Sequence, residues 1–302
     1  MTDVPLPAVA LAAVPGRRKV TLELAREVER RGFSGIYCAT YGDGLGLCEA
    51  LALVTERIPF GTAIANIYTR HVSEYAMTAS LIHEICDGRF HFGVGVSHVP
   101  FLARLGLQGG KPLADMRRFV EELRAVPRAG ELPPLVVAAL RKKMVALAGE
   151  IAEGVVFANA SRSHMSESLA ALPEGKRGDP AFFIGNMIPT CISDDREAAA
   201  AVNRKTLSGY MMLPNYRNYY KEAGYVEEMQ AVENALANRE REKIPSLLSD
   251  RWLADSTLFG TAADVREGVE AWYEAGVRTP MLVPSSAVGN QMKAFEELFA
   301  IF

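Results

Sequence analysis

The chain repeats one pattern, in which a short apolar run is followed by a segment whose apolar residues have helical spacing. Eight runs rich in apolar and β-branched residues occur, at 8–14, 35–40, 59–65, 90–97, 133–140, 154–158, 182–190 and 279–284. Between them, apolar residues recur every three or four positions among charged ones, as in a helix that buries one face. This alternation predicts an α/β protein with a (β/α)8 TIM barrel, and a doubly wound open sheet is the alternative.

One long polar segment interrupts the alternation. Residues 193–257 read as consecutive helices, beginning with Ser193 as an N-cap and two aspartates in the first turn. We therefore expect a single domain over 1–302, with a helical insertion at about 193–257 before the last βα unit. The insertion is rich in tyrosine, and we expect these side chains to cover the barrel mouth: Tyr210, Tyr216, Tyr219, Tyr220 and Tyr225.

The fourth run, at 90–97, has an unusual alternation. Four apolar side chains share one face, whereas the other face carries Gly93 and Gly95. Glycines inside a strand usually mean that another backbone or a ligand comes close. A long loop is expected to follow, from about His98 to Lys111.

Composition narrows the function classes. The 302 residues are 49 % hydrophobic with a formal charge of −3, and no long basic run could follow a nucleic acid backbone. The four cysteines are widely spaced without a C-x-x-C motif, which argues against a disulfide framework and a zinc site. No apolar stretch approaches the ~20 residues of a membrane helix. We expect a cytoplasmic protein without a metal centre or a Ser or Cys nucleophile.

Polar residues collect where the predicted strands end, which is where ligands bind in parallel α/β folds. Asn66 follows the third strand, Ser97 and His98 end the fourth, and Tyr41 and Asp43 lie in the loop after the second. Since imidazole titrates near neutrality, His98 is the best candidate proton donor, and a loop histidine without a role is the alternative. We take His98, Ser97 and Asp43 as candidate catalytic residues. For Asn66 the alternative to ligand binding is a turn or capping side chain.

The other polar residues have plainer interpretations. Arg70 could meet an anionic group, and His71 is expected to make a contact at the start of a helix. His83 and His91 are expected to be structural. His164 is expected to lie at the surface, and contact with a phosphate is the alternative.

Five stretches, taken in order, resemble the luciferase-like monooxygenase superfamily over nearly the whole chain: RRGFSGIYCA, IPFGTAIANIYTRH, DGRFHFGVGVSH, PPLVVAALRKKMVALAGEIAEGVVFANAS and FGTAADVREGVEAWYEAGV. That superfamily includes bacterial luciferase, flavin-dependent monooxygenases and deazaflavin-dependent oxidoreductases. GTAIANIYTRH, GVGVSH and LPNYRNYYKEAGY resemble most closely a subgroup that uses coenzyme F420.

The resemblance implies where a cofactor binds. Its ring is expected at the carboxyl-terminal mouth against Ala63, Ile64 and Asn66, with a non-prolyl cis peptide at Ala63–Ile64. Its phosphate is expected over the loops after the fifth and sixth strands, where helix starts favour anions. The residues at these loops are Ala139, Leu140, Arg141, Asn159, Ala160, Ser161 and Arg162, among which Arg141 and Ser161 are the expected phosphate ligands. Many relatives have glycine-proline where this chain has Arg141-Lys142, and a solvated basic helix start is the alternative.

The expected activity is hydride transfer between coenzyme F420 and a small organic substrate. The alternatives are an FMN-dependent monooxygenase, which uses reduced flavin and oxygen, and a non-catalytic flavin-binding barrel. A flavin or F420 reductase is an expected partner, and a homodimer is expected because relatives commonly dimerise. Neither nucleic acid nor a membrane is an expected partner.

Overall fold

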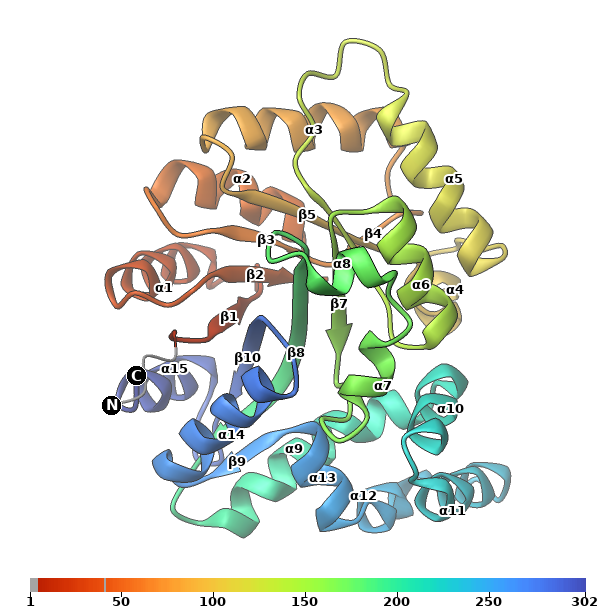
Figure 1. The fold of residues 1–302 in the computed structure, drawn as a ribbon. Coiled ribbons are helices and arrows are strands. Elements are labelled where there is room, and N and C mark those ends of the chain that lie inside the picture. Colours follow the sequence, from red (N-terminus) through yellow and green to blue (C-terminus); the bar gives the residue numbers. More distant parts are fainter. Residues whose placement is uncertain (1–4, 41) are drawn as a thin grey trace.

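The computed structural model describes residues 5–40 and 42–302 and shows a closed parallel barrel (Figure 1). Each barrel strand pairs with the next along the chain, and β10 pairs with both β1 and β8 to close the ring. The barrel strands are β1 (Ala8–Leu11), β2 (Ile36–Ala39), β3 (Phe60–Ala63), β5 (Phe90–Gly95), β6 (Leu135–Ala138), β7 (Gly154–Ala158), β8 (Phe183–Ile192) and β10 (Thr279–Ser285). The predicted (β/α)8 barrel is confirmed, and the open sheet is not adopted.

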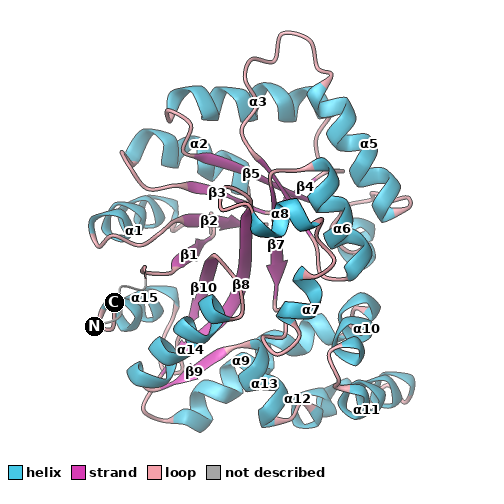
Figure 2. Ribbon diagram, viewed as in Figure 1, coloured by secondary structure: helices cyan, strands magenta, loops and turns pink. Residues whose placement is uncertain are grey.

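Helices surround the strands (Figure 2). The longer ones bury apolar side chains against the barrel and turn a polar face to water. The longer ones are α1 (Arg18–Arg30), α2 (Gly44–Val54), α3 (Val72–Ile85), α5 (Pro112–Arg124), α6 (Lys142–Ile151), α14 (Ala262–Glu274) and α15 (Gln291–Phe299), and the shorter ones are α7 (Met165–Leu169) and α8 (Glu174–Gly178). The loop expected at 98–111 is wrong in part, since it contains α4 (Val99–Arg104). Six residues are too few to establish a helical period in the sequence.

The predicted helical insertion is helical almost throughout. It comprises α9 (Arg196–Met211), α10 (Pro214–Glu222), α11 (Val226–Ala237), η1 (Arg241–Lys243), α12 (Ile244–Leu247) and α13 (Asp250–Ser256), which gather on one side of the barrel (Figure 1). A short strand that the pattern did not predict, β9 (Leu258–Gly260), follows. It pairs in parallel with the last residues of β8.

The third predicted strand is broken. Ala63–Ile64 is a cis peptide, as the resemblance implies, and β4 (Ala65–Asn66) resumes the pairing with β5. The Thr40 hydroxyl donates to the Ile64 carbonyl (2.9 Å) and accepts from the Ile64 amide (3.3 Å). A Cβ atom at Gly93 would lie 1.8 Å from the Thr62 carbonyl oxygen. Gly93 therefore makes room for backbone, whereas a Cβ atom at Gly95 would meet the side chains of Ile64 and Ala138.

Side chains fill the barrel interior. A buried cluster contains Ala8, Tyr37, Ala63, Val136, Val156 and Met281. Beside it the Tyr37 hydroxyl lies 3.2 Å from His91 Nδ1, and the His91 ring packs on Phe183. Burial, with a smaller effect of His83, lowers the pKa of His91 to about 4. His91 is therefore a structural histidine, as expected.

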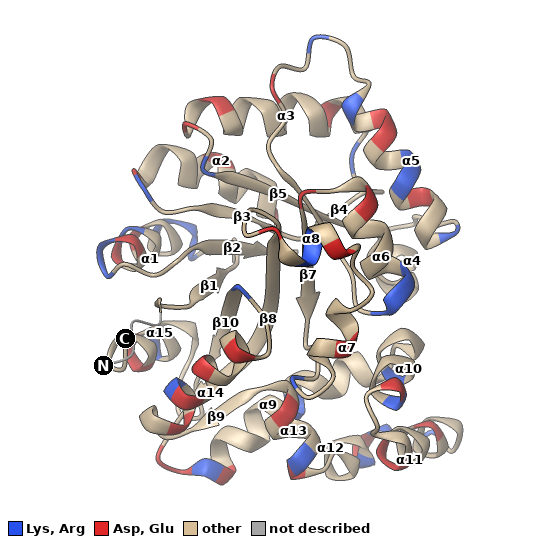
Figure 3. Ribbon diagram, in the orientation of Figure 1, with Lys and Arg blue, Asp and Glu red and all other residues tan. Residues whose placement is uncertain are grey.

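Charged residues of both signs are spread over the helices (Figure 3). Ion pairs join neighbouring helices, as between Arg117 of α5 and Glu150 of α6. The four cysteines are unbridged and buried. Within 5–40 and 42–302, no helix combines the length and the apolar character that crossing a membrane requires.

Candidate functional site

The carboxyl ends of the strands expose apolar side chains. Ile64, Ala138 and Met187 pack against the buried interior cluster, yet each remains partly exposed. Because Ile64 follows β3, Ala138 ends β6 and Met187 pairs with the last residue of β7, they lie at the end of the barrel where polar loops begin. We call these three residues the apolar floor. Such a floor suits one face of a planar ring.

Asn66 is the last residue of β4, and only the oxygen of its side-chain amide has a hydrogen-bond partner. Its Oδ1 accepts from the Tyr68 amide at 3.1 Å, so the turn interpretation is confirmed for the oxygen. Its Nδ2 is buried and has no hydrogen-bond partner. A buried donor without a partner is rare in native proteins and points to a missing acceptor.

Ser97 and His98 connect β5 to α4. Ser97 has φ +57° and turns the chain, so that His98 becomes the residue before the first turn of α4. The His98 ring lies 5.8 Å from the Tyr216 ring, measured between centroids. Burial lowers the pKa of His98, which leaves its imidazole neutral at neutral pH.

Asp43 and Arg70 form an ion pair across the loops after β2 and β4. Arg70 Nη2 donates to both carboxylate oxygens of Asp43, at 2.9 and 2.8 Å, and Asp43 also caps α2 through the Gly46 amide. The anion that Arg70 meets is thus a side chain of the protein. His71 caps α3, the expected contact at a helix start, although it is exposed. Tyr41 lies outside the described residues.

The loop after β6 leads into α6 through Ala139, Leu140 and Arg141. Ala139 is buried, Leu140 is partly exposed, and Arg141 is the residue before the helix. The Arg141 guanidinium pairs with Glu222 of α10, with Nε at 3.0 Å from the carboxylate. Lys142 pairs with Glu167. The two cations at this helix start therefore already have carboxylate partners.

The loop after β7, residues 159–163, is held by internal hydrogen bonds. Ser161 is fully buried; its amide donates to the Tyr219 hydroxyl at 3.0 Å and its hydroxyl donates to Asp255. The Arg162 side chain lines a cavity of about 300 Å³ between α13, β9 and α14. From the sequence, Ser161 and Arg162 were expected to lie together at a phosphate. In the structure Ser161 contacts Asp255, whereas Arg162 lines the separate cavity.

His164, expected at the surface, is buried. Its Nδ1 lies 3.2 Å from Glu167, and its ring packs edge-on against Tyr219. This burial could not be predicted from the sequence, because Tyr219 belongs to the distant insertion.

Helix α10 connects three of these loops. Tyr216 packs against His98 after β5, Glu222 pairs with Arg141 after β6, and the Tyr220 hydroxyl donates to the Asn159 carbonyl after β7. The insertion therefore meets the barrel mouth, as expected. Four of the five tyrosines are buried, so they serve mainly as packing groups: Tyr216, Tyr219, Tyr220 and Tyr225.

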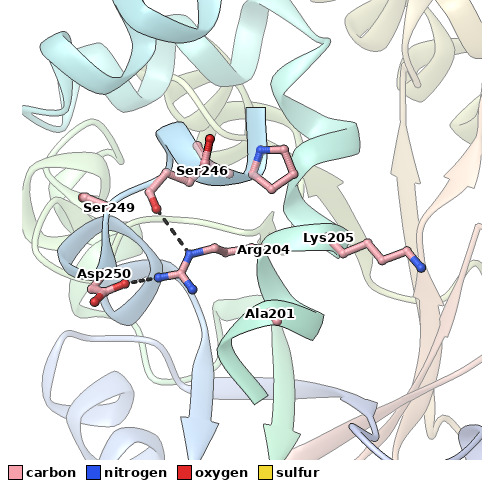
Figure 4. Close-up of a pocket in the computed structure, with 8 residues that line it drawn as sticks. Ala201, Arg204, Lys205, Ser246, Ser249 and Asp250 are labelled. Carbon is pink, nitrogen blue, oxygen red and sulfur yellow. Dashed lines mark hydrogen bonds and ion pairs between the residues drawn. The ribbon is translucent and has the colours of Figure 1, made fainter. Parts of the chain in front are cut away.

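A larger cavity, of about 560 Å³, lies within the insertion (Figure 4). Its walls come from α9, α12 and the start of α13, and Arg204 reaches across it to Asp250. All its lining residues fall between 201 and 250, so this cavity is separate from the strand ends.

Comparisons with known proteins place the chain in a family. Residues 8–279 match the sequence model of the luciferase-like monooxygenases. A relative from Mycobacterium tuberculosis, provisionally named a coenzyme F420-dependent oxidoreductase, is 24 % identical over 88 % of this chain and 90 % of its own.

Two solved structures show the same fold. The coenzyme F420-dependent tetrahydromethanopterin reductase of Methanopyrus kandleri has a TM-score of 0.77 at 17 % identity, covering 98 % of this chain and 97 % of its own. An oxygenating constituent of a Baeyer–Villiger monooxygenase from Pseudomonas putida, solved with FMN, has a TM-score of 0.58 at 15 % identity, covering 93 % and 92 %. With a barrel of this topology and a match over most of its length, the chain belongs to the luciferase-like monooxygenase family.

Proposed function

We propose that the protein is an oxidoreductase that transfers a hydride between coenzyme F420 and a small organic substrate at the carboxyl-terminal mouth of the barrel. The observation that carries the proposal is the unpartnered Asn66 amide beside the apolar floor. The provisionally named F420-dependent relative favours the deazaflavin over FMN. We also propose that the protein acts in the cytoplasm, in keeping with its unbridged cysteines.

The residues present fit a deazaflavin or flavin ring. Ile64, Ala138 and Met187 would contact one face of the ring, and Asn66 Nδ2 would donate to a carbonyl oxygen on its edge. Leaving such a donor buried without an acceptor costs about 1–3 kcal/mol. Binding of the ring would remove this free-energy cost, because the ring would supply the acceptor. The bound deazaflavin supplies the hydride chemistry, and the protein binds, orients and exchanges a proton.

We assign the proton to His98. Its neutral imidazole can accept a proton from a substrate hydroxyl at neutral pH and return it in the reverse direction. Ser97, which turns the chain before His98, fixes where this ring stands. Asp43 has both oxygens bound to Arg70, so we propose that it acts by holding the arginine at the rim.

We also propose a homodimer through the outer face of α2 and α3. Leu53, Met77, Leu81 and Ile85 expose 40–76 % of their surfaces there, and the last three are spaced four residues apart along α3. A row of large apolar side chains on one helix face is typical of a surface that a partner covers. The expected partner is a second copy of this chain.

The test is a titration of the purified protein with F420 and with FMN, each oxidised and reduced, followed by fluorescence. We expect F420 to bind and FMN to bind more weakly, and Asn66→Ala to weaken F420 binding several-fold. Micromolar FMN binding without F420 binding would favour a monooxygenase that receives reduced flavin from a separate reductase. Binding of neither would overturn the proposal, and binding without turnover of any substrate would favour a non-catalytic barrel.

A further inference from the structure

Residues 159–163 of the loop after β7 have no free backbone donor. Every amide N–H from 159 to 163 donates to an acceptor within the protein. The acceptors, in order, are the Met187 carbonyl (2.9 Å), Asn186 Oδ1 (3.4 Å), the Tyr219 hydroxyl (3.0 Å), the Asp255 carbonyl (2.9 Å) and Asp255 Oδ1 (2.8 Å). Because an amide donates one hydrogen bond, an incoming phosphate would find none available.

The two serine hydroxyls of the same loop converge on one acid, whereas Asn159 Nδ2 is buried without a hydrogen-bond partner and Arg162 lines a separate cavity. Asp255, only 8 % exposed, accepts from the Ser161 hydroxyl, from the Ser163 amide and hydroxyl (2.8 Å each) and from the Tyr225 hydroxyl (2.8 Å). Burial and the Asp255 carboxylate raise the pKa of Tyr225, so this group stays a donor.

All the hydrogen-bond donors around the buried Asp255 carboxylate are neutral groups. The ion pairs of the described residues include none to Asp255, and Arg251, from the same helix, lies instead over the Tyr225 ring at 5.3 Å. Hydroxyls and an amide that converge on one buried anion are the donor set that proteins use to bind oxyanions.

We propose that Ser161, Ser163 and Tyr225 form an oxyanion site whose resident anion is Asp255, and that the hydroxyls of Ser161 and Ser163 are thereby unavailable to the phosphate of a cofactor. Asp255 is a positioning residue: it locks residues 161–163 against α13. The Ser161 hydroxyl donates its hydrogen bond to Asp255 and does not bind phosphate. The consequence for the cofactor rests on the proposed function, whereas the assignment of the oxyanion site does not.

The oxyanion site is tested by chemical rescue. Asp255→Ala removes the carboxylate and leaves space for a formate ion. We expect a lowered melting temperature that formate raises by about 2 °C or more, relative to chloride at equal ionic strength, since a ligand that binds only the folded state stabilises it. The control is Asp250→Ala on the same helix, where the side chain is 82 % exposed; neither it nor the wild type should respond. No formate-specific rise, or an equal rise in the control, would overturn the assignment.

The absence of a Ser161 contact to phosphate is tested by two ligands that differ in the phosphate. Kd values for F420 and for its phosphate-free deazaflavin are measured with the wild type and with Ser161→Ala. We expect the ratio of the two Kd values to agree within twofold between the proteins, because Ser161 makes no phosphate contact. A tenfold loss of preference for F420 in Ser161→Ala would overturn the inference, even if Asp255→Ala failed to fold. If the wild type bound neither ligand, the proposed function would fail while the formate experiment still decided the oxyanion site.

Discussion

Removing the histidine of the barrel interior should make the protein less sensitive to acid. His91 is held between Tyr37 and Phe183, and its burial, with a smaller effect of His83, lowers its pKa from the ordinary 6.5 to about 4. The unfolded chain therefore takes up a proton at this position at a higher pH than the folded protein does. The stabilising contribution is complete above pH 6.5 and is lost progressively as the pH falls towards 4.

The size of the effect follows from the two pKa values. At about 1.4 kcal/mol per pH unit, the full gap corresponds to about 3 kcal/mol of unfolding free energy, of which about 2.5 kcal/mol is lost by pH 4.5. His91→Gln removes the titrating ring and keeps a side chain that can hydrogen-bond Tyr37. Carboxylates that titrate in the same range are common to both proteins and cancel in the comparison.

The assay is urea unfolding of the wild type and of His91→Gln at pH 7 and pH 4.5. The wild type should lose about 2.5 kcal/mol more than the variant between the two pH values. His71→Gln, which removes an exposed histidine at a helix start, is the control for loss of a histidine as such. Equal losses in the wild type and in His91→Gln would refute the argument that the folded barrel excludes the proton from this ring.

Three further outcomes are expected. Gly93→Ala should lower the unfolding free energy by about 3 kcal/mol, because its Cβ would overlap the Thr62 carbonyl; a urea midpoint equal to that of the wild type would contradict this close approach. Glu222→Gln should tighten F420 binding about threefold without changing binding of the phosphate-free deazaflavin, since it releases Arg141; equal changes for both ligands would exclude Arg141 as a phosphate ligand. Leu81→Glu should convert a dimer into a monomer in light scattering, and an unchanged mass would place the dimer contact elsewhere.

The fold could be predicted because the barrel strands are largely buried and read as apolar runs. The elements that were missed are short: α4 has six residues and β9 has three, which is less than two turns or two repeats of any pattern. The break between β3 and β4 falls inside one continuous apolar run, so hydrophobicity carries no sign of it. Only the resemblance to a family predicted the cis bond.

The candidate site could be predicted only where its contacts are local. The Asn66 turn closes over two residues and was foreseen as an alternative, and the His71 cap also closes over two residues and was the expected contact. Ser161 looked like an anion ligand because its partner, Asp255, lies 94 residues further along the chain. Arg141 looked like a free cation because Glu222 is 81 residues away.

The contacts of α10 have a consequence for how this barrel can change. One nine-residue helix packs on His98, pairs with Arg141 and supports Asn159, so three loops that lie far earlier in the chain depend on it. A chimera that exchanged only residues 193–257 with a relative would bring foreign partners to all three loops at once. The segments that must be exchanged together at this mouth are therefore not contiguous in the sequence. Recombination and directed evolution of substrate preference would have to transfer the loops and the helix together.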